Sequence, residues 1–224
     1  MMRNSYADFA LYAKDYGISS LSLDYHTKQI ENSMTPYIIE ERQLNSTLID
    51  VFSRLMGERI IWVAGVVDDR MSTVVQAQLM YLQSVNNNDI TMHIDTGGGS
   101  VKSGLSMVDV MDYIKPEIKT INTGMAASMG SVLLGAGTKG KRSMLKHSKT
   151  MLHQSSGGTQ GNIQDARILM IEWEKINDTL FKLLGEYCGK THDQVKEDAS
   201  RDLWLNADES LAYGIIDEII TKKK

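Results

Sequence analysis

From Arg59 onward, short apolar segments alternate with amphipathic ones, and this alternation restricts the possible fold more than any other feature. Three of the apolar segments are typical of buried strands and cover residues 60–67, 90–95 and 118–124. The segment after the first strand repeats apolar residues at helical spacing, with Val75, Leu79 and Leu82 on one face. Strands that alternate with helices at this spacing pair in parallel, so the sequence predicts an α/β fold.

The sequence pattern also predicts further helices and strands. Ser72 is expected to cap the first of these helices. A second helix is expected over about 100–113, and a buried helix of small and apolar residues over 126–137. Two further short strands are expected at 141–145 and 149–153.

The longest predicted helix spans about 163–187, roughly 37 Å at 1.5 Å per residue. Its apolar residues recur in steps of four and three, at Leu169, Trp173, Ile176, Leu180, Leu183 and Tyr187. One interpretation is an amphipathic helix packed within a single subunit. The other is that its far end packs against another subunit, because the helix is longer than its own sheet requires. The preceding glycine-rich segment is expected to be a flexible loop or an irregular strand.

Composition excludes several classes of protein. Lys and Arg number 24 against 28 Asp and Glu, so no excess of positive charge favours nucleic acid or an anionic membrane. Cys188 is the single cysteine, which fits a reducing compartment. The chain has no run of 18 apolar residues and no secretory signal pattern, so we expect a cytoplasmic protein. No His, Cys and carboxylate cluster has metal-ligand spacing, so no metal is expected.

Ser128 lies at a predicted strand-to-helix junction among small residues, in Gly124-Met-Ala-Ala-Ser128-Met-Gly130. This resembles a nucleophile elbow, although Ala126 stands where the usual pattern has glycine. A serine at a helix start can equally be a cap. A nucleophilic serine needs a base, and His153 is the candidate among five histidines because it ends an apolar strand. A structural histidine is the alternative there. Asp202 is a candidate for the third, orienting carboxylate.

Two glycine-rich segments could bind anions. Gly97-Gly98-Gly99 precedes a helix and could stabilise an oxyanion or hold a phosphate, or be a plain tight turn. The segment 135–142 has the glycine and lysine spacing of a phosphate-binding loop, but Arg142 replaces the required Ser or Thr. Nucleotide binding by this chain is therefore not expected.

Taken together, these segments resemble ClpP, the family of proteolytic subunits of ATP-dependent Clp proteases, from about residue 37 to the C-terminus. The matching segments are SRLMGERIIWVAGVVDD (53–69), IDTGGGSVKSG (94–104), GMAASMGSVLLGAGTKGKR (124–142), MLHQSSGG (151–158) and RDLWLNADESLAYGIID (201–217). The resemblance implies a serine endopeptidase with Ser128 as nucleophile, His153 as base and Asp202 as the third member. It also assigns the oxyanion hole to the backbone N–H groups of Gly99 and Met129.

The resemblance implies a ClpP/crotonase-like α/β fold of repeated ββα units with a protruding handle helix. Residues 34–224 would form the peptidase domain, with an axial-pore segment at 34–52 and a handle region at 154–187. Residues 1–33 would be an extension removed on maturation near Ser33 or Met34. The implied assembly is a homo-oligomer of two stacked heptameric rings that encloses the active sites. A hexameric AAA+ unfoldase of the ClpX, ClpA or ClpC type would use ATP and feed in unfolded polypeptides, while this chain would bind no cofactor.

This sequence departs from the family pattern at several positions. Gly97 and Ser155 stand where proline is common, so extra backbone freedom is expected beside the oxyanion loop and the base. Other departures replace docking-pocket aromatics or an acid at the ring contact, at Thr91, His93, Ser143 and Ser200. Two other functions are alternatives. A catalytically silent ring subunit usually lacks a member of the triad, and a crotonase-type acyl-CoA enzyme would leave the triad unexplained.

Overall fold

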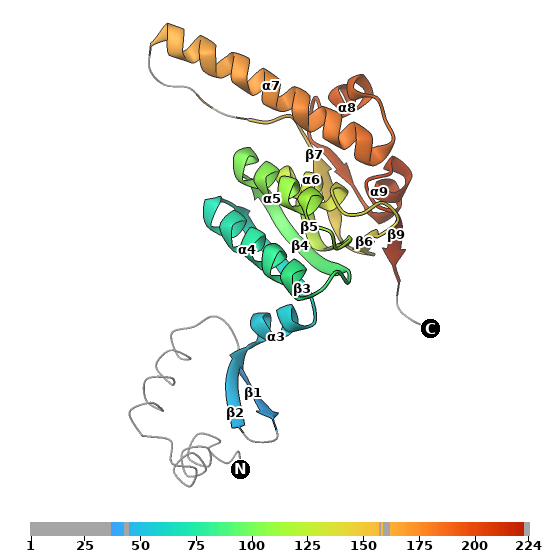
Figure 1. Ribbon diagram of the computed structural model, residues 1–224. Coiled ribbons are helices and arrows are strands. Elements are labelled where there is room, and N and C mark those ends of the chain that lie inside the picture. The colour runs from blue at the N-terminus through green and yellow to red at the C-terminus, as the bar shows by residue number, and fades with distance from the viewer. Residues whose placement is uncertain (1–36, 43–44, 157, 159–161, 222–224) are drawn as a thin grey trace, which may run out of the picture. The chain divides into compact units, whose positions relative to one another are not determined.

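The computed structural model describes residues 37–42, 45–156, 158 and 162–221, and the chain divides into two compact units at residue 57 (Figure 1). In the first unit, β1 (Tyr37–Arg42) and β2 (Asn45–Asp50) form an antiparallel hairpin, and α3 (Val51–Gly57) follows. The predicted axial-pore segment therefore corresponds largely to this hairpin. The predicted extension, residues 1–33, lies outside the described residues.

The second unit is built on one sheet of seven strands. Five strands lie in parallel in the order β3 (Ile60–Val67), β4 (Ile90–Gly99), β5 (Ile118–Ala127), β6 (Arg142–Leu145) and β9 (Glu218–Ile220). The two others diverge from this path at β5, where β7 (Lys149–Leu152) pairs in parallel and then accepts β8 (Leu203–Leu205) as an antiparallel neighbour. The predicted α/β fold with a mostly parallel sheet is confirmed.

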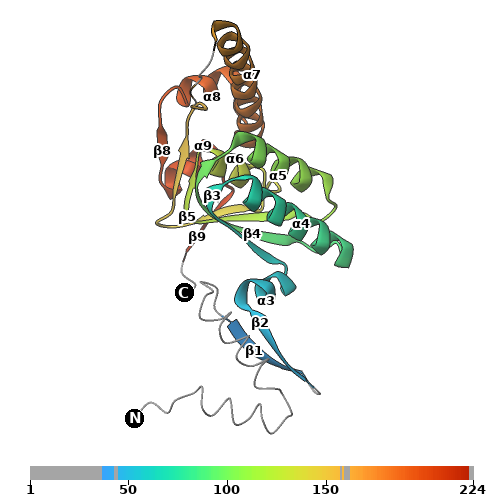
Figure 2. The ribbon, with the colours of Figure 1, turned by 90° about the vertical axis from the view of Figure 1, so that its left-hand side faces the viewer.

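Helices α4 (Asp69–Val85) and α5 (Val101–Tyr113) pack side by side against this sheet (Figures 1 and 2). The predicted face of α4, with Val75, Leu79 and Leu82, is buried. Alternate residues of the strands complete the core, because successive side chains of a strand point to opposite faces. The predicted cap was wrong: Asp68 caps α4 and accepts a hydrogen bond from the Met71 amide, while Ser72 is buried inside the helix.

Two boundaries differ from the sequence prediction, and both differences lie at the carboxyl end of the sheet. β4 continues through the glycine segment, where Gly98 and Gly99 pair with Val66 and Val67, so the segment is not a plain tight turn. β5 continues to Ala127, so the small-residue helix α6 (Met129–Gly135) is shorter than expected. In both cases glycine and alanine continue the strand, because main-chain hydrogen bonds to the neighbouring strands decide the conformation.

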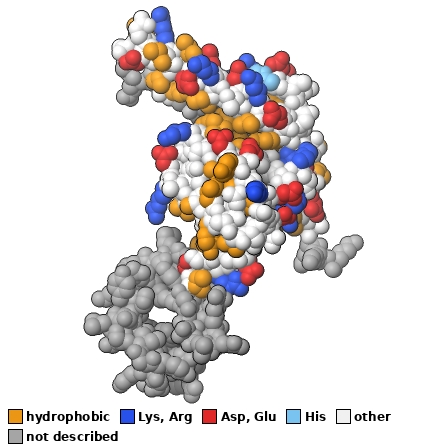
Figure 3. All heavy atoms as spheres, in the orientation of Figure 1, with side chains coloured by type: hydrophobic (Ala, Val, Ile, Leu, Met, Phe, Trp, Pro, Cys, Tyr) orange, Lys and Arg blue, Asp and Glu red, His pale blue; other side chains and the backbone are white. Residues whose placement is uncertain are grey.

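The long helix α7 (Ile163–Cys188) has two different halves. Its C-terminal half packs on the domain through Leu180, Phe181 and Leu184. Its N-terminal half projects beyond the rest of the second unit, and hydrophobic side chains lie along it (Figures 1 and 3). Ile171 there is 54% exposed, and the other exposed apolar residues are Ile163, Ile168, Leu169 and Met170. The burial only partly follows the predicted apolar face: Leu180 is buried, Leu169 is exposed, and the others are half-buried, namely Trp173, Ile176, Leu183 and Tyr187.

The C-terminal segment adds α8 (His192–Asp198) and α9 (Ala207–Tyr213), which the sequence analysis did not predict. Both begin with a capping box, from Thr191 to Gln194 and from Asn206 to Glu209. That motif was the available signal for both helices. They place β8 beside β7 and so bring the segment around residue 202 to the carboxyl end of the sheet.

Candidate active site

Ser128 occupies the junction between β5 and α6 in a strained backbone conformation, with φ 54° and ψ −122°. Its amide donates to the carbonyl oxygen of Met151 at 2.9 Å, which fixes the turn against β7. Although Ser128 stands at the N-cap position, its side chain makes no capping hydrogen bond. The capping interpretation is therefore wrong, and the hydroxyl is directed to another partner.

That partner is His153, which follows the last residue of β7 directly. The pairing of Ala127 with Met151 places the ends of β5 and β7 side by side. As a result, His153 Nε2 lies 2.8 Å from Ser128 Oγ, within hydrogen-bonding distance. A serine with this contact has a base in position to accept its proton.

Asp202 lies on the other side of the histidine ring. It immediately precedes β8, and Leu203 is paired with Leu152, so the antiparallel register brings residues 202 and 153 together. Asp202 Oδ1 lies 3.5 Å from His153 Nδ1, and the side chain of Asp202 is 61% exposed. The carboxylate faces the correct ring nitrogen, but at a longer distance than the histidine–serine contact.

The segment after His153 is held by hydrogen bonds to neighbouring elements. The Gln154 amide donates to the Ala199 carbonyl oxygen at 3.0 Å. The Ser155 amide donates to Asn177 Oδ1 on α7 at 2.8 Å. Proline, which the family commonly has at this position, has no amide hydrogen to donate. The backbone freedom expected at Ser155 is therefore countered by a bond that serine allows.

The glycine segment lies directly against Ser128. A Cβ atom built on Gly98 would lie 2.6 Å from Ser128 Cβ and 2.9 Å from the Met129 amide nitrogen, so only glycine fits. The Gly98 amide donates to Thr96 Oγ1 at 3.0 Å, and the Ser100 amide donates to the Val67 carbonyl oxygen at 2.7 Å. The structure thus brings the Gly98–Gly99 segment and the start of α6 together beside the serine hydroxyl.

The other histidines lie elsewhere. His93 on β4 stacks on Trp62 of β3 with ring centroids 4.7 Å apart, and burial lowers its pKa. His147 lies in an exposed turn, and His192 at the start of α8 contacts Asp178. His26 is outside the described residues. Of the four described histidines, the one predicted as the base is the one that contacts Ser128.

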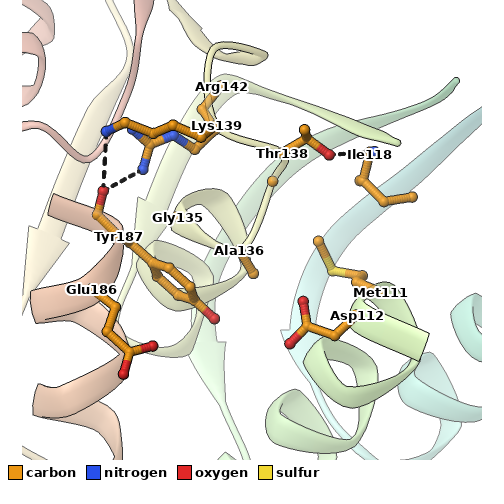
Figure 4. Close-up of a pocket in the computed structure, with 11 residues that line it drawn as sticks. Met111, Asp112, Ile118, Gly135, Ala136, Thr138, Lys139, Arg142, Glu186 and Tyr187 are labelled. Carbon is orange, nitrogen blue, oxygen red and sulfur yellow. Dashed lines mark hydrogen bonds between the residues drawn. The ribbon is translucent and has the colours of Figure 1, made fainter. Parts of the chain in front are cut away.

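A cavity of about 450 Å³ lies between α5, α6 and α7 (Figure 4). Burial and the nearby charges of Asp109 and Glu186 raise the pKa of Asp112 at its edge. Burial likewise raises the pKa of Tyr187. The residues that line this cavity include none of the three predicted catalytic residues. It is therefore separate from the candidate active site.

The glycine-lysine segment that resembles a phosphate-binding loop has its polar groups committed to other partners. Lys141 contacts the carboxylates of Asp89 and Glu117. Arg142 and the amide of Gly140 bind the carboxylate of Asp217. The segment also follows α6 rather than a strand. These contacts give Lys141 and Arg142 structural partners within the chain.

A strained serine at a strand-to-helix turn, in contact with a histidine that also faces a carboxylate, is typical of serine hydrolases. Comparison with known proteins specifies the class further. The sequence model of the Clp protease family matches residues 42–223. Three similar proteins are each named "ATP-dependent Clp protease proteolytic subunit". The chain belongs to the Clp protease family and is therefore an enzyme, a serine peptidase.

The similarity extends over almost the whole of each relative. The Bacteroides fragilis protein (strain YCH46) is 47% identical over 218 residues, covering 96% of this chain and 99% of the relative. The Bacteroides thetaiotaomicron protein is 46% identical over 218 residues, with the same coverage. The Porphyromonas gingivalis protein is 45% identical over 219 residues, covering 97% of this chain and 99% of the relative. In the part of the chain that the structure describes, no helix has the length and hydropathy needed to cross a membrane.

Proposed function

We propose that this chain is the proteolytic subunit of an ATP-dependent Clp protease and hydrolyses peptide bonds with Ser128, His153 and Asp202. The observation that carries the proposal is the 2.8 Å contact between Ser128 Oγ and His153 Nε2 beside a glycine segment. The names of the relatives support the dependence on ATP. We propose that this chain itself binds no cofactor, because the partner unfoldase uses the ATP.

In the proposed mechanism, Ser128 Oγ attacks the scissile carbonyl carbon while His153 Nε2 accepts the hydroxyl proton. The C=O electron pair moves to the oxygen, and the amides of Gly99 and Met129 stabilise the resulting oxyanion. His153 then gives its proton to the leaving amine as the C–N bond breaks. Water attacks the acyl-enzyme by the same route and restores Ser128. Asp202 keeps Nδ1 protonated and stabilises the imidazolium.

Among the amides of the glycine segment, the amide of Gly99 fits the role of oxyanion donor best. The amides on either side of it, those of Gly98 and Ser100, donate to Thr96 Oγ1 and to the Val67 carbonyl oxygen. The Met129 amide begins α6, where the first amides of a helix have no partner inside the helix. Two such donors beside one nucleophile are the arrangement that an oxyanion hole requires.

The proposed assembly is two stacked heptameric rings in the cytoplasm, with unfolded polypeptides as substrates. An AAA+ unfoldase of the ClpX, ClpA or ClpC type would deliver the substrates. The face of this chain on which the unfoldase would dock differs from the family pattern, since Thr91, His93 and Ser143 replace aromatic residues there. The Trp62–His93 stack supplies one aromatic surface on the same strands. The hairpin of β1 and β2 is the proposed wall of the axial pore.

The exposed half of α7 is the proposed contact between the rings. Ile171→Ser should convert double rings to single rings, because the apolar side chain, 54% exposed in this chain, would be buried only in the double ring. Native mass spectrometry gives the number of chains. Glu174→Ser, at an exposed position of the same half, is the matched control and should keep the double ring. Double rings of unchanged stability in the Ile171 variant would contradict this contact.

The experiment that tests the function is labelling of the assembled protein with a fluorophosphonate, followed by peptide mapping. A single adduct on Ser128 is expected, because the reagent reacts with an activated serine and its tetrahedral centre uses the same oxyanion donors. Intact mass of the same sample reports whether residues 1–33 are present. Absence of any adduct, both alone and with an unfoldase present, would refute the assignment of Ser128 as nucleophile.

A further inference from the structure

Thr96 is a buried polar residue three positions before the proposed oxyanion donor Gly99. It lies on β4 with 2% of its surface exposed, and it pairs with Ala126 of β5. A buried hydroxyl is costly unless it is hydrogen-bonded. Its partners therefore indicate what the side chain does at this position.

The hydroxyl of Thr96 joins two backbone segments. It donates to the carbonyl oxygen of Gly65 and accepts from the amide of Gly98 at 3.0 Å. The register of β3 and β4 shifts between Ala64 and Val66, and Gly65 has φ +91°. The side chain of Thr96 thus bonds the irregular part of β3 to the loop that precedes Gly99.

The methyl group of Thr96 faces the other half of the site. A Cβ atom on Gly130 would lie 2.7 Å from Thr96 Cγ2, so the methyl group packs closely against the first turn of α6. That turn begins with Met129, the second proposed oxyanion donor. One side chain therefore contacts both backbone segments that would stabilise the oxyanion.

We propose that Thr96 is a positioning residue for the oxyanion hole, holding the Gly98–Gly99 segment through its hydroxyl and the start of α6 through its methyl group. The inference rests on the proposed function. A positioning role for Thr96 also explains how the loop can be restrained with Gly97 in place of the proline that the family pattern has there. The hydrogen bond from Gly98 to Thr96 supplies a restraint in its place. The far end of the loop is held by the bond from the Ser100 amide to Val67.

The test compares Thr96→Val with Thr96→Ser. Valine keeps the shape and removes both hydrogen bonds, while serine keeps the hydroxyl. We expect Thr96→Val to lower kcat for a short peptide about tenfold to hundredfold, less than complete loss of one oxyanion donor. KM should change less than about threefold, because the oxyanion forms only in the transition state. The rate of fluorophosphonate reaction at Ser128 should fall in parallel. Thr96→Ser, which loses only the methyl contact, should retain more of both rates than Thr96→Val.

Thr120→Val is the matched control. Thr120 is also buried on the same sheet, and its hydroxyl donates to the Leu134 carbonyl oxygen at 2.8 Å. This variant should lower the unfolding midpoint about as much as Thr96→Val while leaving kcat near that of the wild type. Thr96→Ala provides a second variant if the valine variant does not assemble.

The outcomes distinguish the inference from the proposed function. An assembled Thr96→Val protein with kcat within threefold of the wild type would overturn the inference. Equal loss of kcat in Thr96→Val and Thr120→Val would also overturn it, because general destabilisation would then explain both. Failure of the wild-type protein to label at Ser128 would instead refute the proposed function.

Discussion

Replacement of Ser128 by alanine should lower kcat for peptide hydrolysis about 10⁶-fold, because the variant lacks the attacking oxygen. The same variant should give no fluorophosphonate adduct. The fold should be retained, since the side chain is small and its hydrogen-bond partner is the partly exposed His153. Hydrolysis of a fluorogenic peptide by the assembled protein, with intact mass after labelling, measures both effects.

Ser131→Ala is the control for this substitution. Ser131 lies one turn further along α6, and its hydroxyl donates to the Ser128 carbonyl oxygen at 2.7 Å. The control should keep at least about a tenth of the activity and label normally, because it removes a supporting hydrogen bond rather than the nucleophile. Peptide hydrolysis that persists in Ser128→Ala would assign the chemistry to another group. Thioester turnover unaffected by Ser128→Ala would favour the crotonase-type alternative.

Asp217→Asn should destabilise the fold by about 3–5 kcal/mol, because it leaves the buried Arg142 without its counter-charge. Arg142 is 1% exposed, and its Nε and Nη2 donate to the Asp217 carboxylate at 2.8 and 2.6 Å. The Gly140 amide donates to the same carboxylate at 2.7 Å. The pair joins β6 to the C-terminal segment. Urea unfolding at a fixed protein concentration measures the change in free energy of unfolding.

Glu172→Gln is the control for this prediction. Glu172 and Lys175 form an exposed pair on α7, so its loss should change stability by less than about 0.5 kcal/mol. A similarly small effect of Asp217→Asn would contradict the importance assigned to the Arg142–Asp217 pair.

The carboxyl group of Asp217 also makes the stability of the fold depend on pH. Burial acts to raise the pKa of Asp217, but hydrogen bonds and charge from Arg142 outweigh it and lower this pKa from 3.8 to about 2. A carboxylate with a lowered folded-state pKa contributes stability that is fully present above the unfolded value. That contribution should be lost as the pH falls from about 5 toward 2. The wild-type protein should lose it over this range, and Asp217→Asn should not.

Local pattern in the sequence was enough to predict the main strands, α4, α5 and the long helix, because hydrophobic periodicity follows directly from which face is buried. Boundaries were less accurate where caps and tertiary pairing decided them. Asp68 rather than Ser72 caps α4 because its carboxylate reaches the Met71 amide. The glycines at 98 and 99 continue β4 because β3 lies beside them.

The three candidate catalytic residues also differ in how well local sequence identified them. Ser128 was recognisable from its junction between strand and helix, and His153 from its place at a strand end. Asp202 is one of 28 acidic residues, and composition gave no means to choose it without the family resemblance. The antiparallel pairing of β8 with β7 is what brings Asp202 beside His153.

Periodicity and motifs, which are properties of neighbouring residues, were enough to predict the α/β class, the order of the elements from β3 to α7 and the family. The contacts between residues far apart in the chain came from the folded structure alone. Thr96 has no local signal, yet it bonds both Gly65 and Gly98 because the β3 irregularity lies across from it. Arg142 occurs in a segment that resembles a phosphate-binding loop, and its burial with Asp217 depends on a chain separation of 75 residues. Such contacts follow from strand register and packing, which short-range pattern does not encode.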